Sequence, residues 1–372
     1  MKKQNRFLTT FLSILLGLVF GAIALLIAGY NPIEAYKIVL EGIFGSPKYI
    51  SYAIVRSTPI IITGISVAFA FRTGLFNIGA EGQYIIGALA ATAVGAYVKF
   101  LPFGIHGLVA LLVGALAAGL WGGLVGFLKS RRGVNEVISS IMLNWIALYL
   151  NNSLLNAKNL GFRRPNSDSS QKILDTAKTN ILLKWKTSDA GRAVLKNNKL
   201  LKDILNPPVN IGIFVAIILA ILVWYILKHR TLGYQLKAVG YNKDAAEYAG
   251  IDIKKNIVRS MFISGAIAGI AGATQVLGVS HHVSLLGAPE GYGFDGMAVA
   301  LIAGNNPLAT IPAGLLFGGL KYGGAKLNSS VLEAPSEIIN IVIGVIVLFV
   351  AMPKLFIYIR ERLGRSRGEK NV

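Results

Sequence analysis

Cysteine is absent from this chain of 372 residues, which excludes disulfides, thiolate catalysis and cysteine-based metal sites. Histidine is scarce, with four residues in all, and two of these, His281 and His282, are neighbours in the sequence. Adjacent side chains on a helix point about 100° apart, so this pair is a poor chelate, and we expect no metal site. Charged residues are few, at 15 % against 54 % hydrophobic residues. This composition excludes an ordinary soluble domain and is typical of a polytopic membrane protein.

The motifs of nucleotide binding and of hydrolytic enzymes are also missing. No G-x-x-x-x-G-K-[ST] string occurs, and the glycine-lysine stretch at 318–326 lacks both the spacing and the Ser or Thr of a phosphate-binding loop. No H-E-x-x-H or G-x-S-x-G motif occurs either, so we expect no catalytic residue and no bound cofactor. If ATP drives this protein, another polypeptide has to bind the ATP and its Mg²⁺ ion.

The net charge of +20 does not indicate a nucleic-acid partner, because the Lys and Arg residues lie in clusters at the ends of apolar runs and not along one amphipathic face. The clearest cluster is at 129–132. Basic clusters of this kind mark the cytoplasmic ends of membrane helices. The partner that they indicate is a lipid bilayer.

The apolar runs predict an all-α polytopic membrane protein of about ten transmembrane helices with both termini in the cytoplasm. The first run, 7–29, is too long for the core of a signal peptide and predicts a retained span. A short surface helix is expected at 33–44, where apolar residues recur at helical spacing. The predicted parts are a first transmembrane half at 1–155 with spans one to five, a polar extracytoplasmic insert at 156–207, a second half at 208–352 with spans six to ten, and a basic cytoplasmic tail at 353–372.

The insert is basic, with eleven Lys or Arg residues against four Asp between 156 and 206. Counting spans places it outside, in conflict with the positive-inside rule. We keep it outside because the reverse orientation would export the basic residues of 228–259. A helix is expected at 173–185, and the insert is either a docking surface or a variable loop without a dedicated role.

Polar residues and glycines interrupt the membrane pattern at 71–83, here called the polar segment, whose sequence is FRTGLFNIGAEGQ. Asn77, Glu81 and Gln83 lie there between two apolar runs that are each long enough to enter a bilayer. Polar groups at membrane depth survive where protein or water surrounds them, so we predict that these residues line a translocation pathway. The alternative is a tight cytoplasmic turn in which Glu81 is a solvated first-turn residue.

Two further stretches add pathway candidates. Asn135 and Asn144 belong to a polar stripe at the start of span five, which faces either protein and water or the headgroup region. Asp295 lies in span eight, which is short and ends at a proline, so we expect a broken or re-entrant helix. The sequence of 287–292 echoes that of 79–83, which indicates a two-fold internal repeat or a chance likeness.

A cytoplasmic loop at 229–257 contains a short helix that is capped at both ends. Asn242 is a suitable N-cap and Gly250 suits the left-handed position past the helix end. Such a rigid helix fits a contact that transmits force, although an ordinary amphipathic loop helix has the same pattern. The candidate coupling residues are Tyr241, Asn242, Asp244, Ala245, Ala246, Gly250 and Ile251.

The polar segment contains GLFNIGAEGQ, and this string resembles the motif of permease subunits of bacterial ABC importers in the branched-chain amino acid, ribose and nucleoside branch. The string GVNEVISSIMLN at 133–144 resembles the nucleoside, guanosine-type members more narrowly. The resemblance implies an importer of nucleosides or related small polar solutes. It also implies a second, related permease chain in a heterodimer, an ATP-binding cassette ATPase that docks on the loop at 229–257, and an extracellular lipid-anchored substrate-binding protein.

An ion-coupled secondary transporter is the alternative function. Glu81, Glu136, Glu290 or Asp295 would then carry protons or hold sodium. A channel is a third class, with no filter-like repeat to support it. The capped loop at 229–257 favours a protein driven by a separate motor subunit, because a coupling helix has no role in a transporter driven by an ion gradient.

Overall fold

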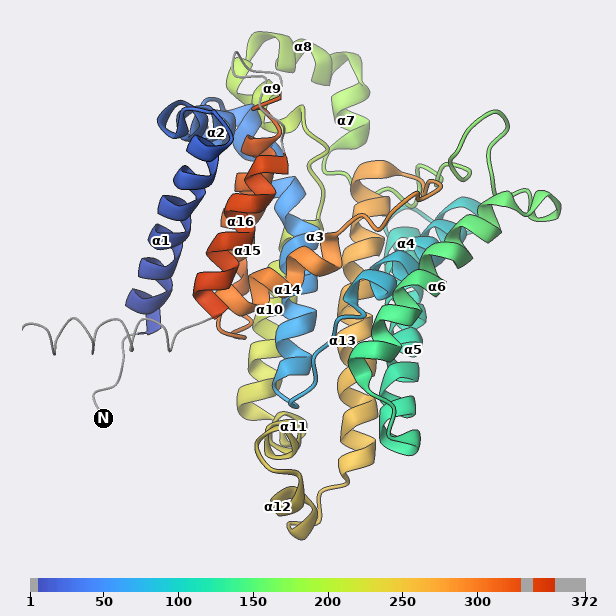
Figure 1. The fold of residues 1–372 in the computed structure, drawn as a ribbon. Coiled ribbons are helices and arrows are strands. Elements are labelled where there is room, and N and C mark those ends of the chain that lie inside the picture. Colours follow the sequence, from blue (N-terminus) through green and yellow to red (C-terminus); the bar gives the residue numbers. More distant parts are fainter. Residues whose placement is uncertain (1–5, 329–336, 352–372) are drawn as a thin grey trace, which may run out of the picture. The chain divides into compact units, whose positions relative to one another are not determined.

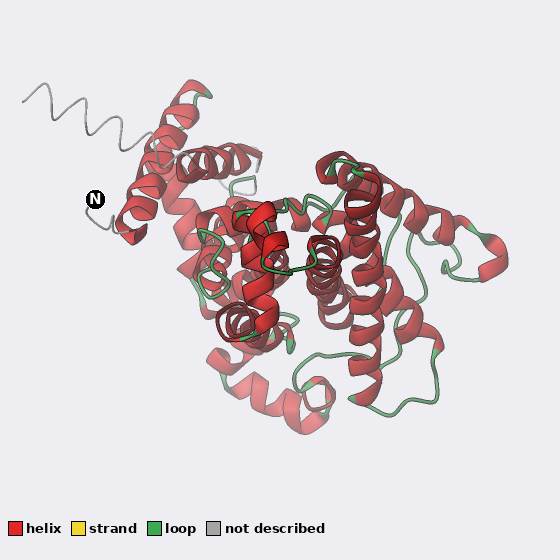
Figure 2. Ribbon diagram, turned by 90° about the horizontal axis from the view of Figure 1, so that it is seen from below, coloured by secondary structure: helices red, strands yellow, loops and turns green. Residues whose placement is uncertain are grey.

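The computed structural model describes residues 6–328 and 337–351, and these consist of helices and loops with three isolated backbone bridges (Figure 2). The chain divides into two compact units, the first formed by the residues up to Gly45 and from Leu320 onward, the second by Ser46–Gly319. The basic tail predicted at 353–372 lies outside the described residues.

The first unit contains α1 (Arg6–Ile27), α2 (Pro32–Phe44), the end of α15 (Thr310–Gly324) and α16 (Glu337–Ala351). The predicted short helix is confirmed as α2, and Asn31 caps it by accepting the N–H of Ile33 at 3.0 Å. The chain bends by 119° between α1 and α2. A Cβ atom on Gly17 would lie 2.4 Å from Ile346, so α1 and α16 pack with their backbones close together.

The second unit holds most of the helices. They are α3 (Pro47–Phe71), α4 (Ala80–Tyr97), α5 (Ile105–Arg132), α6 (Glu136–Asn156), α7 (Leu183–Thr187), α8 (Asp189–Asn197), α9 (Lys199–Leu205), α10 (Gly212–His229), α11 (Thr231–Tyr241), α12 (Lys243–Tyr248), α13 (Ile253–Gln275), which continues into the single π-helical turn η2 (Val276–Ser280), α14 (Tyr292–Ile302) and the first part of α15.

Helices α4, α5 and α13 form the centre of this unit, with α13 packed against both others (Figure 1). Glycines allow this contact. A Cβ atom on Gly87 of α4 would lie 2.4 Å from the backbone of Gly269 in α13, and one on Gly265 would lie 2.5 Å from the carbonyl oxygen of Ala118 in α5. Real Cβ contacts are never this short, so the three backbones touch where side chains would otherwise separate them.

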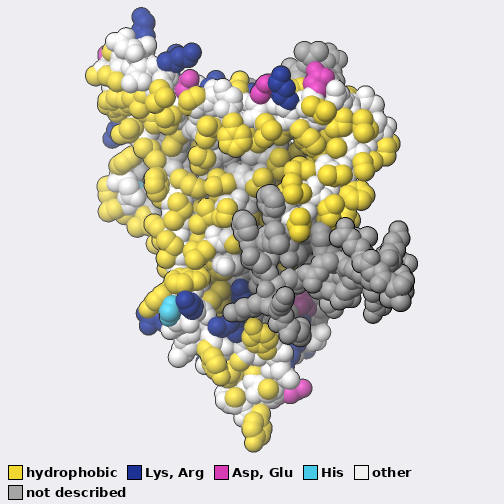
Figure 3. Space-filling model, turned by 90° about the vertical axis from the view of Figure 1, so that its left-hand side faces the viewer, with side chains coloured by type: hydrophobic (Ala, Val, Ile, Leu, Met, Phe, Trp, Pro, Cys, Tyr) yellow, Lys and Arg dark blue, Asp and Glu magenta, His cyan; other side chains and the backbone are white. Residues whose placement is uncertain are grey.

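Helices α3, α5, α10 and α13 with η2 are long and apolar enough to cross a membrane, and the bent pair α1 and α2 is a fifth candidate. On the face seen in Figure 3, most of the coloured side chains are hydrophobic. The chain is therefore a multi-pass membrane protein. The count of ten spans, the side of the termini and the internal repeat stay predictions.

Within the second unit, the insert and the loop at 229–257 lie at opposite ends (Figure 1). Helices α7, α8 and α9 form one end and α11 and α12 the other, with the short α14 between them. The helix predicted at 173–185 is wrong for most of its length, because only the stretch from Leu183 is helical. The preceding residues form a loop with one turn, and their backbone groups bond other segments: the Ile173 N–H donates to the His281 carbonyl oxygen and the Leu174 N–H donates to that of Gly95.

Candidate functional site

The polar segment joins α3 to α4 and lies inside the protein. Gly74, with φ of +71°, turns the chain in a left-handed conformation that favours glycine, and α4 then begins at Ala80. The side chains of Asn77, Glu81 and Gln83 are 0 % exposed. Buried polar groups require partners, and all three side chains have them.

Asn77 and Gln83 bond each other through both ends of their amides. The Asn77 Nδ2 atom donates to Gln83 Oε1 at 2.8 Å, and Gln83 Nε2 donates to Asn77 Oδ1 at 3.1 Å. Asn77 Nδ2 also lies 2.7 Å from the Ser264 hydroxyl, whose own proton goes to the carbonyl oxygen of Ser66. This network connects α3, α4 and α13.

Glu81 bonds a segment that lies more than 200 residues away in the sequence. Its two carboxylate oxygens accept the backbone N–H groups of Gly291 at 2.8 Å and of Gly293 at 2.6 Å. These N–H groups belong to the start of α14, where the helix dipole favours a negative charge. Glu81 therefore anchors the N-terminus of the short helix α14 to the first turn of α4.

The other end of α14 is bonded to the same segment. The Arg72 guanidinium donates to the carbonyl oxygen of Asn305, three residues past the helix end, at 2.9 Å. Asn305 has a φ of +56°, unusual for a residue other than glycine. The polar segment thus holds α14 at both ends.

Asn144 of α6 brackets the start of α4. Its Oδ1 atom accepts the N–H of Gly82 at 2.8 Å, and its Nδ2 atom donates to the carbonyl oxygen of Ile78 at 3.0 Å. The structure therefore brings together four of the six predicted pathway residues, namely Asn77, Glu81, Gln83 and Asn144.

The remaining two predicted residues have different surroundings. Asn135 is exposed and caps α6 by accepting the N–H of Val137 at 2.8 Å, about two and a half helical turns from Asn144. Asp295 lies in the first turn of α14 and is half-buried. Glu136, the acidic neighbour of Asn135, forms an ion pair with Lys129.

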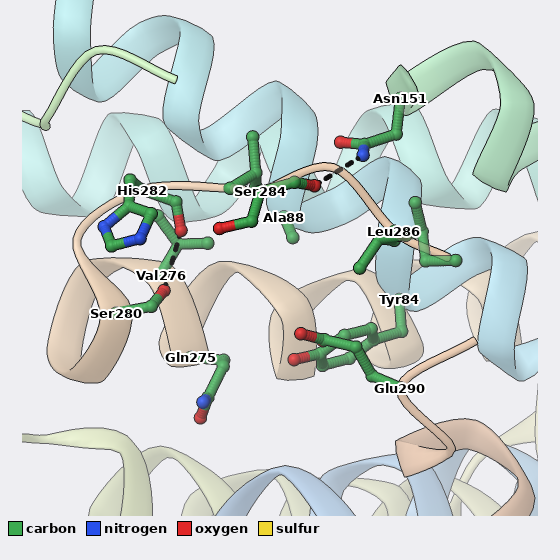
Figure 4. Close-up of a pocket in the computed structure, with 12 residues that line it drawn as sticks. Tyr84, Ala88, Asn151, Gln275, Val276, Ser280, His282, Ser284, Leu286 and Glu290 are labelled. Atoms are coloured by element: carbon green, nitrogen blue, oxygen red, sulfur yellow. Dashed lines mark hydrogen bonds between the residues drawn. The ribbon is translucent and has the colours of Figure 1, made fainter. Parts of the chain in front are cut away.

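A polar pocket of about 80 Å³ lies next to this network (Figure 4). Its walls come from α4, α6, the end of α13 with η2, and the loop between η2 and α14. Asn151 donates to the Ser284 carbonyl oxygen at 2.9 Å across it, and Glu290 lies beside the Tyr84 ring (Figure 4). Pockets that hold small organic ligands measure about 300–1,000 Å³, so the pocket is closed in this conformation.

The sequence reasoning missed most of the pocket residues. Asn151, Gln275, Ser280 and Ser284 are polar residues near the ends of apolar runs, and no motif marks them. Two signals were present, because Tyr84 directly follows the polar segment and Glu290 belongs to the stretch that echoes it.

The loop at 229–257 folds locally as predicted. Asn242 caps α12 by accepting the N–H of Ala245 at 3.0 Å, and Gly250 follows with a φ of +76°. Tyr241 at the end of α11 and Tyr248 at the end of α12 are 86 % and 97 % exposed, so the loop presents aromatic side chains to its surroundings. The other predicted coupling residues lie on or next to α12: Asp244 and Ala245 are exposed, Ala246 is buried and Ile251 is half-buried.

The end of α11 touches the polar segment directly. A Cβ atom on Gly240 would lie 2.4 Å from the carbonyl oxygen of Arg72 and 3.0 Å from the backbone nitrogen of Gly74. Thr73 in the same turn shares a 2.8 Å hydrogen bond with Ser260 of α13. A displacement of α11 and α12 therefore meets the polar segment without an intervening side chain.

Membrane helices, a buried polar network and a closed polar pocket define the class as a multi-pass membrane transport protein. The model of the family described as "Branched-chain amino acid transport system / permease component" matches residues 49–351. The chain belongs to this family of membrane permeases, as the polar segment predicted.

Individual relatives match over nearly the whole length. The chain is 39 % identical to the guanosine ABC transporter permease protein NupP of Bacillus subtilis, covering 98 % of this chain and 99 % of NupP. It is 31 % identical to the nucleoside ABC transporter permease protein NupB of Lactococcus lactis, covering 99 % of both. It is also 28 % identical to the glucose ABC transporter permease protein TsgB13 of Haloferax volcanii, covering 94 % of this chain and 88 % of TsgB13.

Proposed function

We propose that this chain is the permease subunit of an ABC importer that moves nucleosides into the bacterial cell. The observation that supports the substrate class is the nearly full-length similarity to two relatives named for guanosine and for nucleosides. The permease itself hydrolyses nothing. The family resemblance supplies the rest of the assembly: an ATPase that binds ATP and Mg²⁺, a second, related permease chain, and an extracellular lipid-anchored binding protein.

The contacts support a route for force from the cytoplasm to the pocket. The ATPase would dock on α12 and the end of α11, whose exposed Tyr248 and Tyr241 suit a protein interface. Movement of α12 and α11 would then displace the turn at Arg72–Gly74, against which Gly240 packs. The polar segment holds both ends of α14, so this helix and the pocket wall before it would move with the segment.

The six predicted residues keep a role in this pathway as part of the proposal. Asn77, Glu81, Gln83 and Asn144 would fix the wall between the polar segment and the pocket, while Asp295 would move with α14. Asn135 would act at the cytoplasmic end of α6.

The ion-coupled alternative needs carboxylates that can exchange ions. Glu81 accepts two backbone N–H groups and Glu136 is paired with Lys129, so both are already occupied. These contacts support a mechanical role for the two residues and not an ion-exchanging one.

The test is uptake of radiolabelled guanosine by vesicles that contain the tagged chain with its co-purified partners. Uptake is expected to require ATP and to be insensitive to a proton uncoupler. Vesicles with the chain alone serve as the control and are expected to be inactive. Concentrative uptake by the chain alone, driven by an ion gradient, would overturn the proposal.

A further inference from the structure

The insert contains a second hollow, which is separate from the polar pocket and from the loop at 229–257. Its volume is about 530 Å³, and α7, α8 and α9 form its sides. We call it the basic hollow, because the charged side chains that line it are all cationic. They are Lys186, Arg192, Lys196 and Lys202.

The positive charge of the hollow is not balanced by acidic residues in its lining. No Asp or Glu is among the described residues that line it. Arg192, Lys196 and Lys202 are exposed, while Lys186 is partly buried and donates to the carbonyl oxygen of Leu205. Like charges brought together repel one another, so this arrangement favours an anionic occupant.

We expect the insert to carry its positive charge on the side of the membrane where basic residues are disfavoured. It lies at the opposite end of the second unit from α12, and α10 is the membrane-spanning helix between them (Figure 1). If α12 meets a cytoplasmic ATPase, the insert is extracytoplasmic. Lys and Arg are disfavoured in translocated loops of this size, so eleven such residues there indicate a use for their charge.

The base of the insert is hydrogen-bonded to the wall of the polar pocket. Residues 168–181, here called the strap, run beside the loop that follows η2. The N–H of Ser170 donates to the Val283 carbonyl oxygen at 2.8 Å, and the N–H of Leu285 donates to the Asp168 carbonyl oxygen at 2.8 Å. Val283 lines the polar pocket, so the strap holds a piece of its wall.

His281 connects the two cavities. It lines the basic hollow, and its carbonyl oxygen accepts the N–H of Ile173 from the strap at 3.0 Å. The next residue, His282, lines the polar pocket. A force on the hollow therefore reaches the pocket through one backbone segment.

We propose that the basic hollow is where an acidic surface of the extracellular binding protein docks, and that the strap passes this contact to the polar pocket. This inference rests on the proposed function. A protein is favoured over an anionic lipid because α8, which carries Arg192 and Lys196, lies beyond the end of the membrane helix α13 (Figure 1). Electrostatic complementarity of this kind sets the encounter rate and the orientation of a partner.

The experiment compares two triple variants of the chain within the complete complex. The test variant, R192Q/K196Q/K202Q, removes three cations from the hollow and leaves Lys186 in place because it bonds the backbone. The matched control, K99Q/K184Q/K199Q, removes three exposed cations that belong neither to the hollow nor to the strap. ATP-driven guanosine uptake is measured in vesicles against the concentration of added binding protein.

The test variant is expected to raise the half-saturating concentration of binding protein about tenfold at low salt, because three favourable charge contacts are lost. The difference should shrink at high salt, where charges are screened. The control is expected to match the parent, as is R192K/K196R/K202R, which keeps the charge.

Three outcomes would overturn the docking surface. The control could raise the half-saturating concentration of binding protein as much as the test variant does. Alternatively, the test variant could have the same half-saturating concentration as the parent. The effect could also appear in vesicles that contain phosphatidylglycerol and vanish in pure phosphatidylcholine, which would assign the hollow to a lipid headgroup. In each case the parent still imports guanosine with ATP, so the proposed function survives. A parent complex without ATP-driven uptake would overturn the proposed function, and this inference with it.

Discussion

Replacing Glu81 by Ala would remove the carboxylate that accepts the Gly291 and Gly293 N–H groups at the start of α14. Each hydrogen bond to a charged group contributes about 1.5–3 kcal/mol, and the helix dipole adds about 0.3–1 kcal/mol. We therefore expect Glu81→Ala to lower the free energy of unfolding by about 3 to 7 kcal/mol. Glu81→Gln keeps one acceptor oxygen, so its free energy of unfolding should fall by about half as much.

The assay has two readouts. The first is thermal unfolding of the purified protein in detergent. The second uses the absence of cysteine, because Met297→Cys in α14 gives a single thiol whose labelling by a maleimide reports the opening of this helix. Labelling should be faster with Glu81→Ala than with Glu81→Gln, and slowest in the parent.

One result would refute this reasoning. If Glu81→Ala unfolded at the parent temperature and labelled at the parent rate, while the KM for uptake changed, Glu81 would be a lining residue of the pathway and not an anchor for α14.

The remaining predictions concern four other positions. Gly250→Val forces a β-branched residue into a left-handed conformation, and we expect ATP hydrolysis to continue while uptake falls, measured side by side in vesicles. Gly240→Ala places a Cβ atom 2.4 Å from the Arg72 carbonyl oxygen, so it should uncouple transport similarly, and unchanged uptake would contradict the contact. Asn144→Ala leaves two buried backbone groups unpaired and should cost about 1–3 kcal/mol of unfolding free energy in a denaturant titration. Burial lowers the pKa of His281, so the folded state favours its neutral form; stability should fall as the pH drops below the usual histidine range, and His281→Gln should reduce that dependence.

Local patterns in the sequence predicted local structure well. The cap of Asn242 on α12 and the short helix α2 follow from a few adjacent residues, because capping bonds span only two or three positions. The burial of the polar segment was also predictable, since unpaired polar groups in lipid are too costly to persist there.

Long-range pairing was not predictable in the same way. The partners of Glu81 lie 210 and 212 positions further along the chain, and no local pattern encodes them. The helix expected at 173–185 was wrong for the same reason, because backbone groups of this stretch bond His281, Leu277 of η2 and Gly95 at the end of α4. Tertiary contacts override propensity where the partner is distant in sequence.

The glycine contacts among α4, α5 and α13 have a mechanical consequence. Backbones in direct contact leave no space into which the helices could tilt toward one another, so we expect this trio to move as one body. In an importer built on this trio, we expect no passage to open between α4, α5 and α13. Alternating access would then arise from rigid-body movement of this trio against another element, such as a second permease chain.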